Sequence, residues 1–249
     1  KYNKNFFGLV SATNPEYKAF VAGNYNYEKE NIWLTGFARF DRLYDDSQKQ
    51  ITIMPTWRKY LMTHINTDTG VWEEGAGFKS SEYFKFYNSL INDERLISAA
   101  EKHGYTICYM PHPNIITKAH MFDHNEKVKF FTINDEYRDI YAQSDLVLTD
   151  YSSAIFDFAY LRKPVVYAEF DKEVFFGGKH VCTTGYFDTE TDGFGEVAYD
   201  YETTVNLLID YIENGCELKD KYRERIDNFF AFNDKNNCQR ILDKILELK

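Results

Sequence analysis

The sequence predicts an open α/β fold, in which a parallel sheet carries helices on both of its faces. Short apolar runs that are typical of buried strands alternate along the chain with segments whose apolar residues recur at helical spacing. Strands that alternate with helices in this way are usually parallel and joined by crossover helices. At 249 residues the chain is also long enough to bury a substantial core. We therefore expect one compact α/β unit.

The first third of the chain predicts three short strands. These are Phe6–Val10, Ile32–Leu34 and Ile51–Met54. A short helix or turn runs from Asn14 to about Val21 and is followed by a loop around Gly23–Asn26. Residues 63–80 contain three glycines and mixed charges, so we expect them to form a loop.

The middle of the chain predicts one long helix and then a regular alternation. The long helix covers Ser81–His103 and ends at Gly104. The elements expected after it are strands Tyr105–Met110, Val128–Thr132, Leu146–Thr149 and Val165–Ala168, and helices Asp135–Gln143 and Ser153–Leu161.

The last part of the chain predicts a loop and three helices. Asp171–Ala198 is rich in glycine and aromatic residues and lacks periodicity, so we expect an ordered loop near a ligand. Thr203–Glu213 places its apolar residues on one helix face. Two further helices, about Leu218–Phe230 and Asp234–Leu248, are expected to close the chain.

The most informative segment is a turn rich in hydroxyl groups, Thr149-Asp150-Tyr151-Ser152-Ser153, which links an expected buried strand to a helix. Ser152 or Ser153 can cap that helix, and the free N–H groups of its first turn form a site for an anion. Open α/β folds also bind their ligands at such carboxyl ends of strands. The alternative is that the serines only cap a core helix.

A second candidate is His112, which lies between Pro111 and Pro113 at the end of an expected strand. The prolines stop the strand and fix the backbone, so the imidazole projects from the carboxyl edge of the sheet. There it could donate a hydrogen bond to a phosphate oxygen or protonate a leaving phosphate. The alternative is a solvent-exposed histidine at a capped strand end.

A third candidate is the segment Pro55-Thr56-Trp57-Arg58, which also follows a strand. Arg58 offers a planar fork that matches phosphate, and Thr56 offers a hydroxyl for the same use. The alternative places Arg58 in a surface ion pair, and we expect Trp57 to pack in the core.

Three further charged residues are expected to support these candidates. Arg39 can pair with Asp41 or with a later carboxylate. Because a carboxylate repels phosphate, Asp157 is better suited to organising the loop than to binding the anion. For Asp150 we leave open whether it organises the loop or binds sugar or glycerol hydroxyls.

Composition excludes several classes of partner. The net charge of −10, from 29 basic and 39 acidic residues, argues against nucleic-acid binding and against a polybasic membrane anchor. The four cysteines are far apart, which suggests a reducing, cytosolic setting without a zinc knuckle or a disulfide framework. The His120 and His124 pair lacks a metal-binding frame, so we expect no metal site. No apolar run has transmembrane length, so any membrane attachment must come from elsewhere.

The hydroxyl-rich turn, the His112 segment and the Pro55–Arg58 segment, together with further segments of the chain, resemble the CDP-glycerol glycerophosphotransferase family of teichoic-acid and capsule polymerases and primases. The resemblance runs from about Thr35 to the C-terminus and departs from the family habit at Ala38, where a proline is common. The matching segments, in order, are Thr35–Asp41, Met54–Arg58, Met110–Pro113, Asp145–Phe158, Lys163–Tyr167, Phe170-Asp171 and Phe232–Asp234.

The resemblance implies a fold, an architecture and a reaction. Family members resemble GT-B glycosyltransferases, with two Rossmann-like domains that face each other across a cleft. Residues 31–249 would be the C-terminal, donor-binding domain, and residues 1–30 a remnant or linker from a missing N-terminal acceptor domain. The reaction would transfer a polyol phosphate from CDP-glycerol or CDP-ribitol to a lipid-linked teichoic acid or capsular polymer, with release of CMP. The donor is a substrate, and no cofactor is implied.

The resemblance also implies roles for individual residues. His112 would be catalytic, while Asp150, Asp157 and Arg39 would support the site. The donor phosphates would be held by Ser152, Ser153, Thr149, Arg58 and Thr56, and the nucleotide by Pro113, Asp135 and Asp139.

The resemblance also has implications for turnover and for location. The family's Trp-His-Gly segment, thought to supply the base, has no match here, so this half alone is expected to bind donor without turnover. The whole protein would be cytoplasmic and peripheral at the bacterial membrane. A glycosyltransferase domain that uses a nucleotide sugar and a non-catalytic nucleotide-binding module stay as alternatives.

Overall fold

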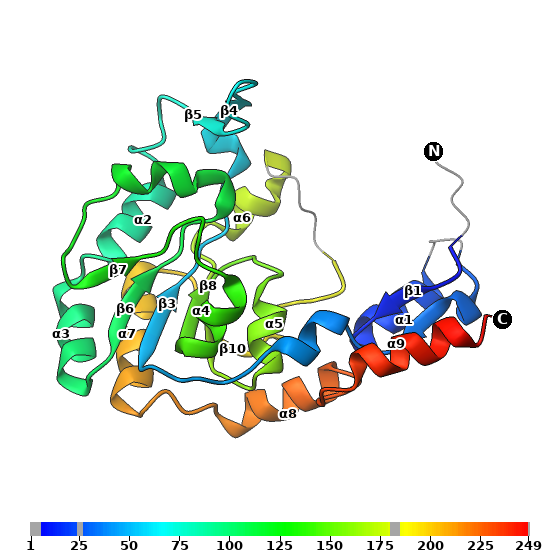
Figure 1. The fold of residues 1–249 in the computed structure, drawn as a ribbon. Coiled ribbons are helices and arrows are strands. Elements are labelled where there is room, and N and C mark those ends of the chain that lie inside the picture. Colours follow the sequence, from blue (N-terminus) through cyan, green and yellow to red (C-terminus); the bar gives the residue numbers. More distant parts are fainter. Residues whose placement is uncertain (1–5, 24–26, 180–184, 249) are drawn as a thin grey trace.

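The fold is built around a six-stranded parallel sheet (Figure 1). A computed structural model describes residues 6–23, 27–179 and 185–248. The strands lie in the order β10-β9-β8-β3-β6-β7, and every neighbouring pair is parallel. Their bounds are β3 Gln50–Ile53, β6 Thr106–Tyr109, β7 Val128–Phe130, β8 Ser144–Thr149, β9 Val165–Ala168 and β10 Gly195–Ala198. The predicted parallel α/β fold is therefore confirmed.

The strand order is that of a Rossmann-like sheet. Numbered along the chain from β3 as the first strand and read from β7, the order is 3-2-1-4-5-6. The order of addition reverses between β3 and β8, which lie side by side at the centre of the sheet. Ligands of open α/β folds bind at this switch point, outside the carboxyl ends of the strands.

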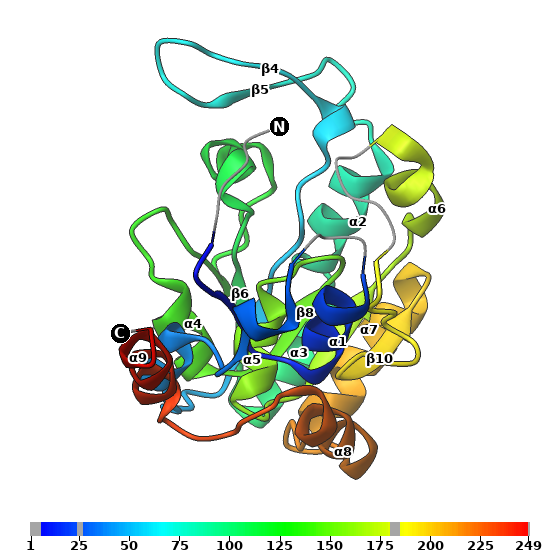
Figure 2. The same cartoon turned by 90° about the vertical axis from the view of Figure 1, so that its right-hand side faces the viewer.

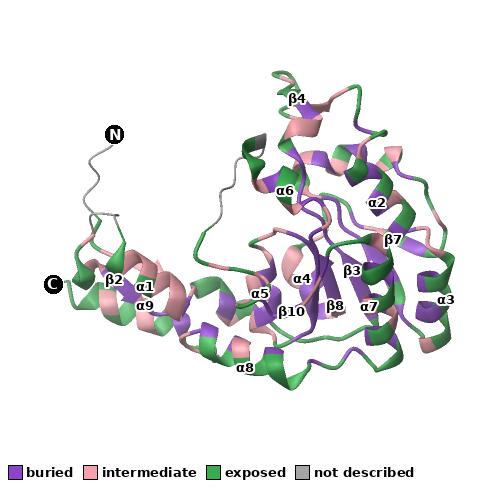
Figure 3. Cartoon of the chain, turned by 180° about the vertical axis from the view of Figure 1, so that it is seen from behind, coloured by how far each residue is buried: buried purple, intermediate pink, exposed green. Residues whose placement is uncertain are grey.

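Helices cover both faces of the sheet, because alternate side chains of each strand enter two different cores. Leu146 and Leu148 of β8 point into one core, whereas Val147 points into the other. The first core is covered by α2 Glu82–Leu90, α3 Glu94–His103 and α7 Tyr201–Glu213, and the second by α4 Tyr137–Gln143, α5 Ile155–Tyr160 and α8 Asp220–Phe229. The central strands β3, β8 and β9 are almost wholly buried between them (Figure 3).

The single helix predicted over residues 81–103 is wrong, because two helices occupy this stretch. α2 ends at Leu90, and the Asp93 side chain starts α3 by accepting hydrogen bonds from the amides of Arg95 and Leu96. Asp93 thereby caps the first turn of a new helix. The predicted end of that helix at Gly104 is confirmed.

Both segments predicted as loops contain regular structure. Residues 63–80 hold most of an antiparallel hairpin of β4 Met62–Ile65 and β5 Trp72–Glu74, which projects beyond the sheet (Figures 1 and 2). Residues 171–198 hold α6 Lys172–Val174, the π-helical turn Phe175–Lys179 and strand β10, although 180–184 lie outside the described residues. At Gly195, a Cβ would lie 1.7 Å from the Val165 carbonyl oxygen, so only glycine lets β10 pair with β9 here.

A smaller two-stranded parallel sheet lies beside the main one. β1 Leu9–Ser11 pairs with β2 Ile32–Leu34, and α1 Asn14–Ala22 connects them. The small sheet thus ends at Leu34, beyond residue 30, where the remnant or linker was expected to end. The helix α9 Asn237–Leu246 packs on the 3-10 turn η2 Ala38–Arg42 next to this sheet (Figure 1). Gly36, at φ 79°, leaves room for Asn237 of α9, whose Oδ1 would lie 1.8 Å from a Cβ.

Three further elements complete the described part of the chain. They are the 3-10 turns Lys29–Asn31, Lys59–Leu61 and Pro113–Met121. Within the described ranges, no helix combines the length and the apolar character needed to cross a membrane.

Candidate functional site

The candidate site lies at the switch point, where the segments after β3 and β8 are tied together. The Thr149 hydroxyl, at the end of β8, donates to the carbonyl oxygen of Met54 at 2.8 Å. The amide of Thr56 donates to Asp150 Oδ1, also at 2.8 Å. The hydroxyl-rich turn and the Pro55–Arg58 segment, which the sequence singled out separately, therefore meet at one edge of the sheet.

Asp150 joins the segments of this edge, as expected of a residue that organises the loop. Its side chain is fully buried. Oδ1 accepts from the amides of Thr56 and Tyr151, and Oδ2 accepts from the Tyr87 hydroxyl and lies 2.9 Å from Arg58 Nη2. Both oxygens are thus occupied by protein groups.

Arg58 does not present its fork to an open phosphate site, which corrects the prediction from sequence. Its side chain has no exposed surface. Nε and Nη2 donate to Asp171 at 2.7 and 2.9 Å, and Nη1 donates to the carbonyl oxygen of Thr56 at 2.7 Å. Burial opposes the positive charge, but attraction to Asp150 and Asp171 raises the pKa of Arg58 well above its usual value. Two carboxylates thus take up the guanidinium.

The hydroxyls of the turn serve different purposes. Ser152 Oγ accepts from the amide of Ala154 at 3.3 Å, and the N-cap of α5 is Ala154 itself. The prediction that a serine caps α5 is therefore wrong, because the turn places Ser152 too early. Ser153 is exposed, and its hydroxyl makes no hydrogen bond to any part of the chain that the structure describes.

The two threonines of the prediction are less available than Ser153. The Thr149 hydroxyl is fully buried and bonded to Met54. Thr56 Oγ1 is buried without a hydrogen-bond partner among the described residues. Neither hydroxyl faces solvent in this conformation.

An exposed arginine lies next to Ser153 instead. Arg39 Nε and Nη2 donate to the two oxygens of Asp157 at 2.8 and 2.9 Å, which confirms the predicted pairing with a later carboxylate. Asp157 thereby holds Arg39, and its role in organising the loop stays a prediction. A hollow of about 270 Å³ is lined by Arg39, Tyr137, Tyr141, Ser153, Ala154 and Asp157.

Asp41, the other possible partner of Arg39, has a different task. It accepts from the amides of Asn237 and Cys238 at 2.9 and 2.7 Å, at the first turn of α9. Burial pushes the pKa of Asp41 upward, but these hydrogen bonds bring it below its usual value. Asp41 therefore anchors α9 and does not face the hollow.

His112 lies at the same edge, after β6, which neighbours β3. Its Nδ1 accepts from the amide of Asn114 at 3.2 Å, so a neutral imidazole carries its proton on Nε2. The imidazole ring stacks on the ring of Trp57, with ring centroids 6.0 Å apart. The ring of Trp57 in turn contacts that of Trp72 in the hairpin, with centroids 5.0 Å apart. The predicted core position of Trp57 is confirmed, since it is 8% exposed.

The predicted nucleotide contacts lie around this edge but engage local partners. Asp135 accepts from the amide and hydroxyl of Thr132, and Asp139 accepts from Tyr44 and Arg138. Pro113 is exposed and begins a 3-10 turn. A second hollow of about 310 Å³ is lined by Arg39, Arg42, Leu43, Tyr141, Asp157 and the residues between the two aspartates, Glu136, Tyr137 and Arg138. A nucleotide role for Asp135 and Asp139 stays a prediction.

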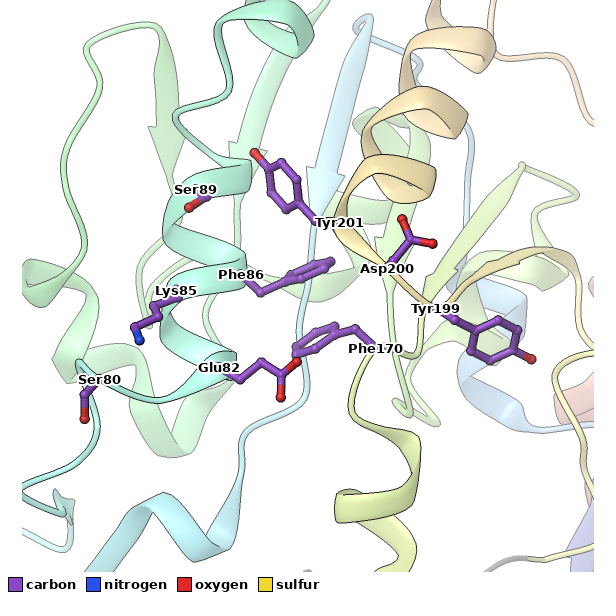
Figure 4. Close-up of a pocket in the computed structure, with 9 residues that line it drawn as sticks. All are labelled: Ser80, Glu82, Lys85, Phe86, Ser89, Phe170, Tyr199, Asp200 and Tyr201. Carbon is purple, nitrogen blue, oxygen red and sulfur yellow. The ribbon is translucent and has the colours of Figure 1, made fainter.

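A larger hollow, of about 630 Å³, contains none of the predicted site residues (Figure 4). It lies between α2 and the start of α7, and its central rings, Phe86 and Phe170, stack on each other at 3.9 Å. Its lining is Ser80, Glu82, Lys85, Phe86, Ser89, Phe170, Tyr199, Asp200 and Tyr201.

The sequence motifs do not identify two residues of the candidate site, Asp171 and Tyr87. Asp171 follows β9 in the Phe170-Asp171 pair, so its place after a strand was an available signal. Tyr87 lies inside α2 on a helix face that reads only as core, and nothing in its sequence context points to Asp150.

Comparisons with known proteins identify the family of this chain. The family model for CDP-glycerol:poly(glycerophosphate) glycerophosphotransferase matches residues 1–247. The minor teichoic acid biosynthesis protein GgaB of Bacillus subtilis (strain 168) is 45% identical over the whole of this chain and 27% of its own length. The teichoic acid ribitol-phosphate polymerase TarK of Staphylococcus aureus (strain NCTC 8325 / PS 47) is 25% identical over 90% of this chain and 42% of its own. The chain thus spans less than half the length of either relative.

A solved structure has the same fold. The wall teichoic acid polymerase TagF aligns over 98% of this chain and 59% of its own, with a TM-score of 0.62 and 17% identity. A TagF variant soaked with CDPG aligns equally well, with a TM-score of 0.60, 18% identity, and coverage of 98% and 58%. The family model and the relative GgaB both cover essentially the whole chain. This chain therefore belongs to the CDP-glycerol:poly(glycerophosphate) glycerophosphotransferase family, a family of transferases.

Proposed function

We propose that this chain binds a CDP-activated polyol, such as CDP-glycerol or CDP-ribitol, for transfer of its polyol phosphate to a teichoic acid polymer with CMP leaving. The observation that carries the proposal is the junction at the switch point, where the Thr56 amide and Asp150 join the segments after β3 and β8. A diphosphate bound at this crevice would lie beside the hydroxyl-rich turn. Membership of the family supports the donor class.

The donor phosphates would be held by exposed groups of the smaller hollow. Ser153 and Arg39 both line it, and Arg39 is 55% exposed although it pairs with Asp157. A guanidinium forms charge-assisted hydrogen bonds with phosphate oxygens, and a serine hydroxyl adds one more donor. Because the chain carries a net charge of −10, an anion must be captured by such local groups rather than by the overall field.

The chemical step needs an aligned acceptor, donors that neutralise phosphate charge, and a base for the acceptor hydroxyl. We assign charge neutralisation to Arg39 and Ser153, and we propose that His112 donates from Nε2 to a phosphate oxygen or to the leaving CMP. None of these residues accepts the proton of the attacking hydroxyl in this scheme. We propose that another domain of the whole protein supplies that base and binds a lipid-linked acceptor at the cytoplasmic face of the membrane.

The small N-terminal sheet is consistent with that two-domain scheme. β1 and β2 form a parallel pair that is separate from the six-stranded sheet, and Phe6 and Phe7 next to β1 are 46% and 78% exposed. Parallel sheets are normally buried on both faces. We propose that this pair and its flanking segment face the acceptor domain.

Calorimetric titration of the purified chain tests the proposed donor class. CDP-glycerol, CDP-ribitol and CMP should bind, and UDP-N-acetylglucosamine should bind more weakly. Arg39→Gln should weaken binding of the CDP compounds, whereas Arg162→Gln should not, although Arg162 forms a comparable exposed pair with Asp227 at the other edge of the sheet. Preference for the UDP-sugar would indicate a nucleotide-sugar glycosyltransferase, and failure of every nucleotide to bind would contradict a donor site.

A further inference from the structure

A buried ionic cluster lies directly beneath the hydroxyl-rich turn. It consists of Arg58, Asp150 and Asp171, and we call it the Arg58 cluster. Each member comes from a different loop at the carboxyl edge: Arg58 follows β3, Asp150 follows β8, and Asp171 follows β9. The cluster therefore joins three neighbouring loops.

The guanidinium is held by these loops at four of its five N–H groups. It makes the two-point contact with Asp171 and the contact with Asp150 described above, and Nη1 donates to the Thr56 carbonyl oxygen. None of the three side chains is more than 2% exposed. Pairs buried in this way cannot exchange partners with water, so their geometry is fixed by the fold.

The charges of the cluster do not cancel, because two carboxylates face one guanidinium. Tyrosine hydroxyls stabilise the excess negative charge through hydrogen bonds. Tyr87 donates to Asp150 at 3.1 Å, and Tyr60 and Tyr151 donate to Asp171 at 3.2 and 3.1 Å. Aromatic rings enclose the cation, with centroids of Tyr83, Tyr151 and Phe175 within 4.8 to 5.1 Å of its central carbon. The carboxylates are thus satisfied without any ligand.

The cluster also sets the path of the turn. Asp150 Oδ1 accepts the amide of Tyr151, the residue before Ser152, and the Tyr151 hydroxyl returns to Asp171. Tyr151 is therefore held at both its backbone and its ring. Because Ser152 and Ser153 follow directly, their positions depend on these contacts.

We propose that Arg58 is a positioning residue, which fixes the Asp150–Ser153 turn for the donor through Asp150 and Asp171 without contacting the donor itself. This inference rests on the proposed donor site. Lysine would keep the charge, but it lacks the planar fork that reaches both carboxylates at once. The role thus requires arginine.

The test uses Tyr87→Phe, which removes one hydrogen bond to Asp150 and keeps the buried ring, alongside Arg58→Lys. The matched control is Tyr211→Phe, which removes a tyrosine hydrogen bond to Glu196 away from the turn. Amide hydrogen exchange of residues 150–156 and the calorimetric affinity for CDP-glycerol are measured at a temperature where every variant is folded. Tyr87→Phe should accelerate exchange in this segment by about 10-fold and weaken affinity by about 3- to 10-fold. Arg58→Lys should exceed both effects, and Tyr211→Phe should show neither.

A Tyr87→Phe variant that lowers the melting temperature but leaves both local exchange and affinity unchanged would overturn the inference, because its effect would then be purely structural. This variant decides the question even if Arg58→Lys does not fold. If the unmodified chain binds no CDP-glycerol, the proposed function fails, while the exchange of residues 150–156 still shows whether the cluster positions the turn.

Discussion

Arg39 and Asp157, 118 residues apart in the sequence, form a two-point ion pair beside Ser153. The pair joins η2 to the first turn of α5, and the guanidinium remains 55% exposed while the carboxylate is 18% exposed. It therefore orients an accessible cation at the hollow where we place the donor phosphates.

Asp157→Asn should weaken CDP-glycerol binding by about 3- to 10-fold, because Arg39 loses the charged partner that orients it. The free energy of unfolding should change by less than about 1 kcal/mol, since exposed ion pairs contribute little. Titration calorimetry and urea unfolding of the same sample measure both quantities. Tighter donor binding would instead show that Asp157 competes with phosphate for Arg39.

We expect the two serines of the turn to have different roles: Ser153 binds the donor, and Ser152 stabilises the fold. Ser153→Ala should reduce donor affinity by about 1.5–3 kcal/mol, the range for a hydrogen bond to a charged group, with little effect on stability. Ser152→Ala should lower stability by about 1 kcal/mol, because its hydroxyl accepts a hydrogen bond from the Ala154 amide in the turn before α5. Replacing both should therefore cost about as much affinity as Ser153→Ala alone, whereas a larger loss of about 2–4 kcal/mol would show that both serines contact the diphosphate. Equal melting temperatures and affinities for all variants would contradict this division.

His112→Ala, introduced into the whole protein, should slow polymer synthesis by about 10²- to 10⁴-fold, the range for loss of an acid or a phosphate donor. The fold should tolerate the change, because the flanking prolines already end β6. His112→Gln keeps a hydrogen-bond donor but cannot deliver a proton, so partial recovery would indicate an electrostatic role. Near-normal rates with both variants would indicate that the reacting phosphate does not lie at this edge of the sheet.

The attachment of α9 should depend on pH through Asp41. Its pKa in the folded protein lies below the usual value of 3.8, so the stabilisation is fully present above that value and is lost as pH falls through the lower, folded-state pKa. Asp41→Asn should lower stability by about 1 kcal/mol at neutral pH. The difference from the unmodified chain in urea unfolding should shrink below about pH 4. A difference that stays constant down to pH 3 would contradict the assignment.

The sequence was sufficient to predict the central sheet, because the buried strands of this sheet are continuous apolar runs. The prediction was wrong where the local pattern and the tertiary context disagree. The apolar residues Leu90 and Ile91 continue the helical pattern across the break before Asp93, and strand β10 has only four residues, beginning with a glycine. Asp93 was a usable signal, since aspartate is a favoured N-cap.

The site shows a similar limit. The chain position of Arg58, directly after a strand, correctly placed it at the carboxyl edge. Whether its fork faces a ligand depends on Asp171, 113 residues further on, and on the rings that close over it. No spacing in the sequence distinguishes an open arginine from a buried one. The sequence therefore located the edge but did not show that Arg58 is buried there.

The tyrosines around the Arg58 cluster also set an upper limit on the pH that the fold withstands. Burial is the largest cause that raises the pKa of Tyr60, to about 12, and that raises the pKa of Tyr83, Tyr87 and Tyr151 above the usual value of 10.0. Stability contributed by such groups is fully present below pH 10 and declines as pH rises toward their folded-state values. These phenols should thus ionise only when the chain unfolds. Absorbance at the phenolate wavelength should rise in two stages, first for surface tyrosines and then abruptly with alkaline denaturation, so the protein carries its own optical reporter of the integrity of its candidate site.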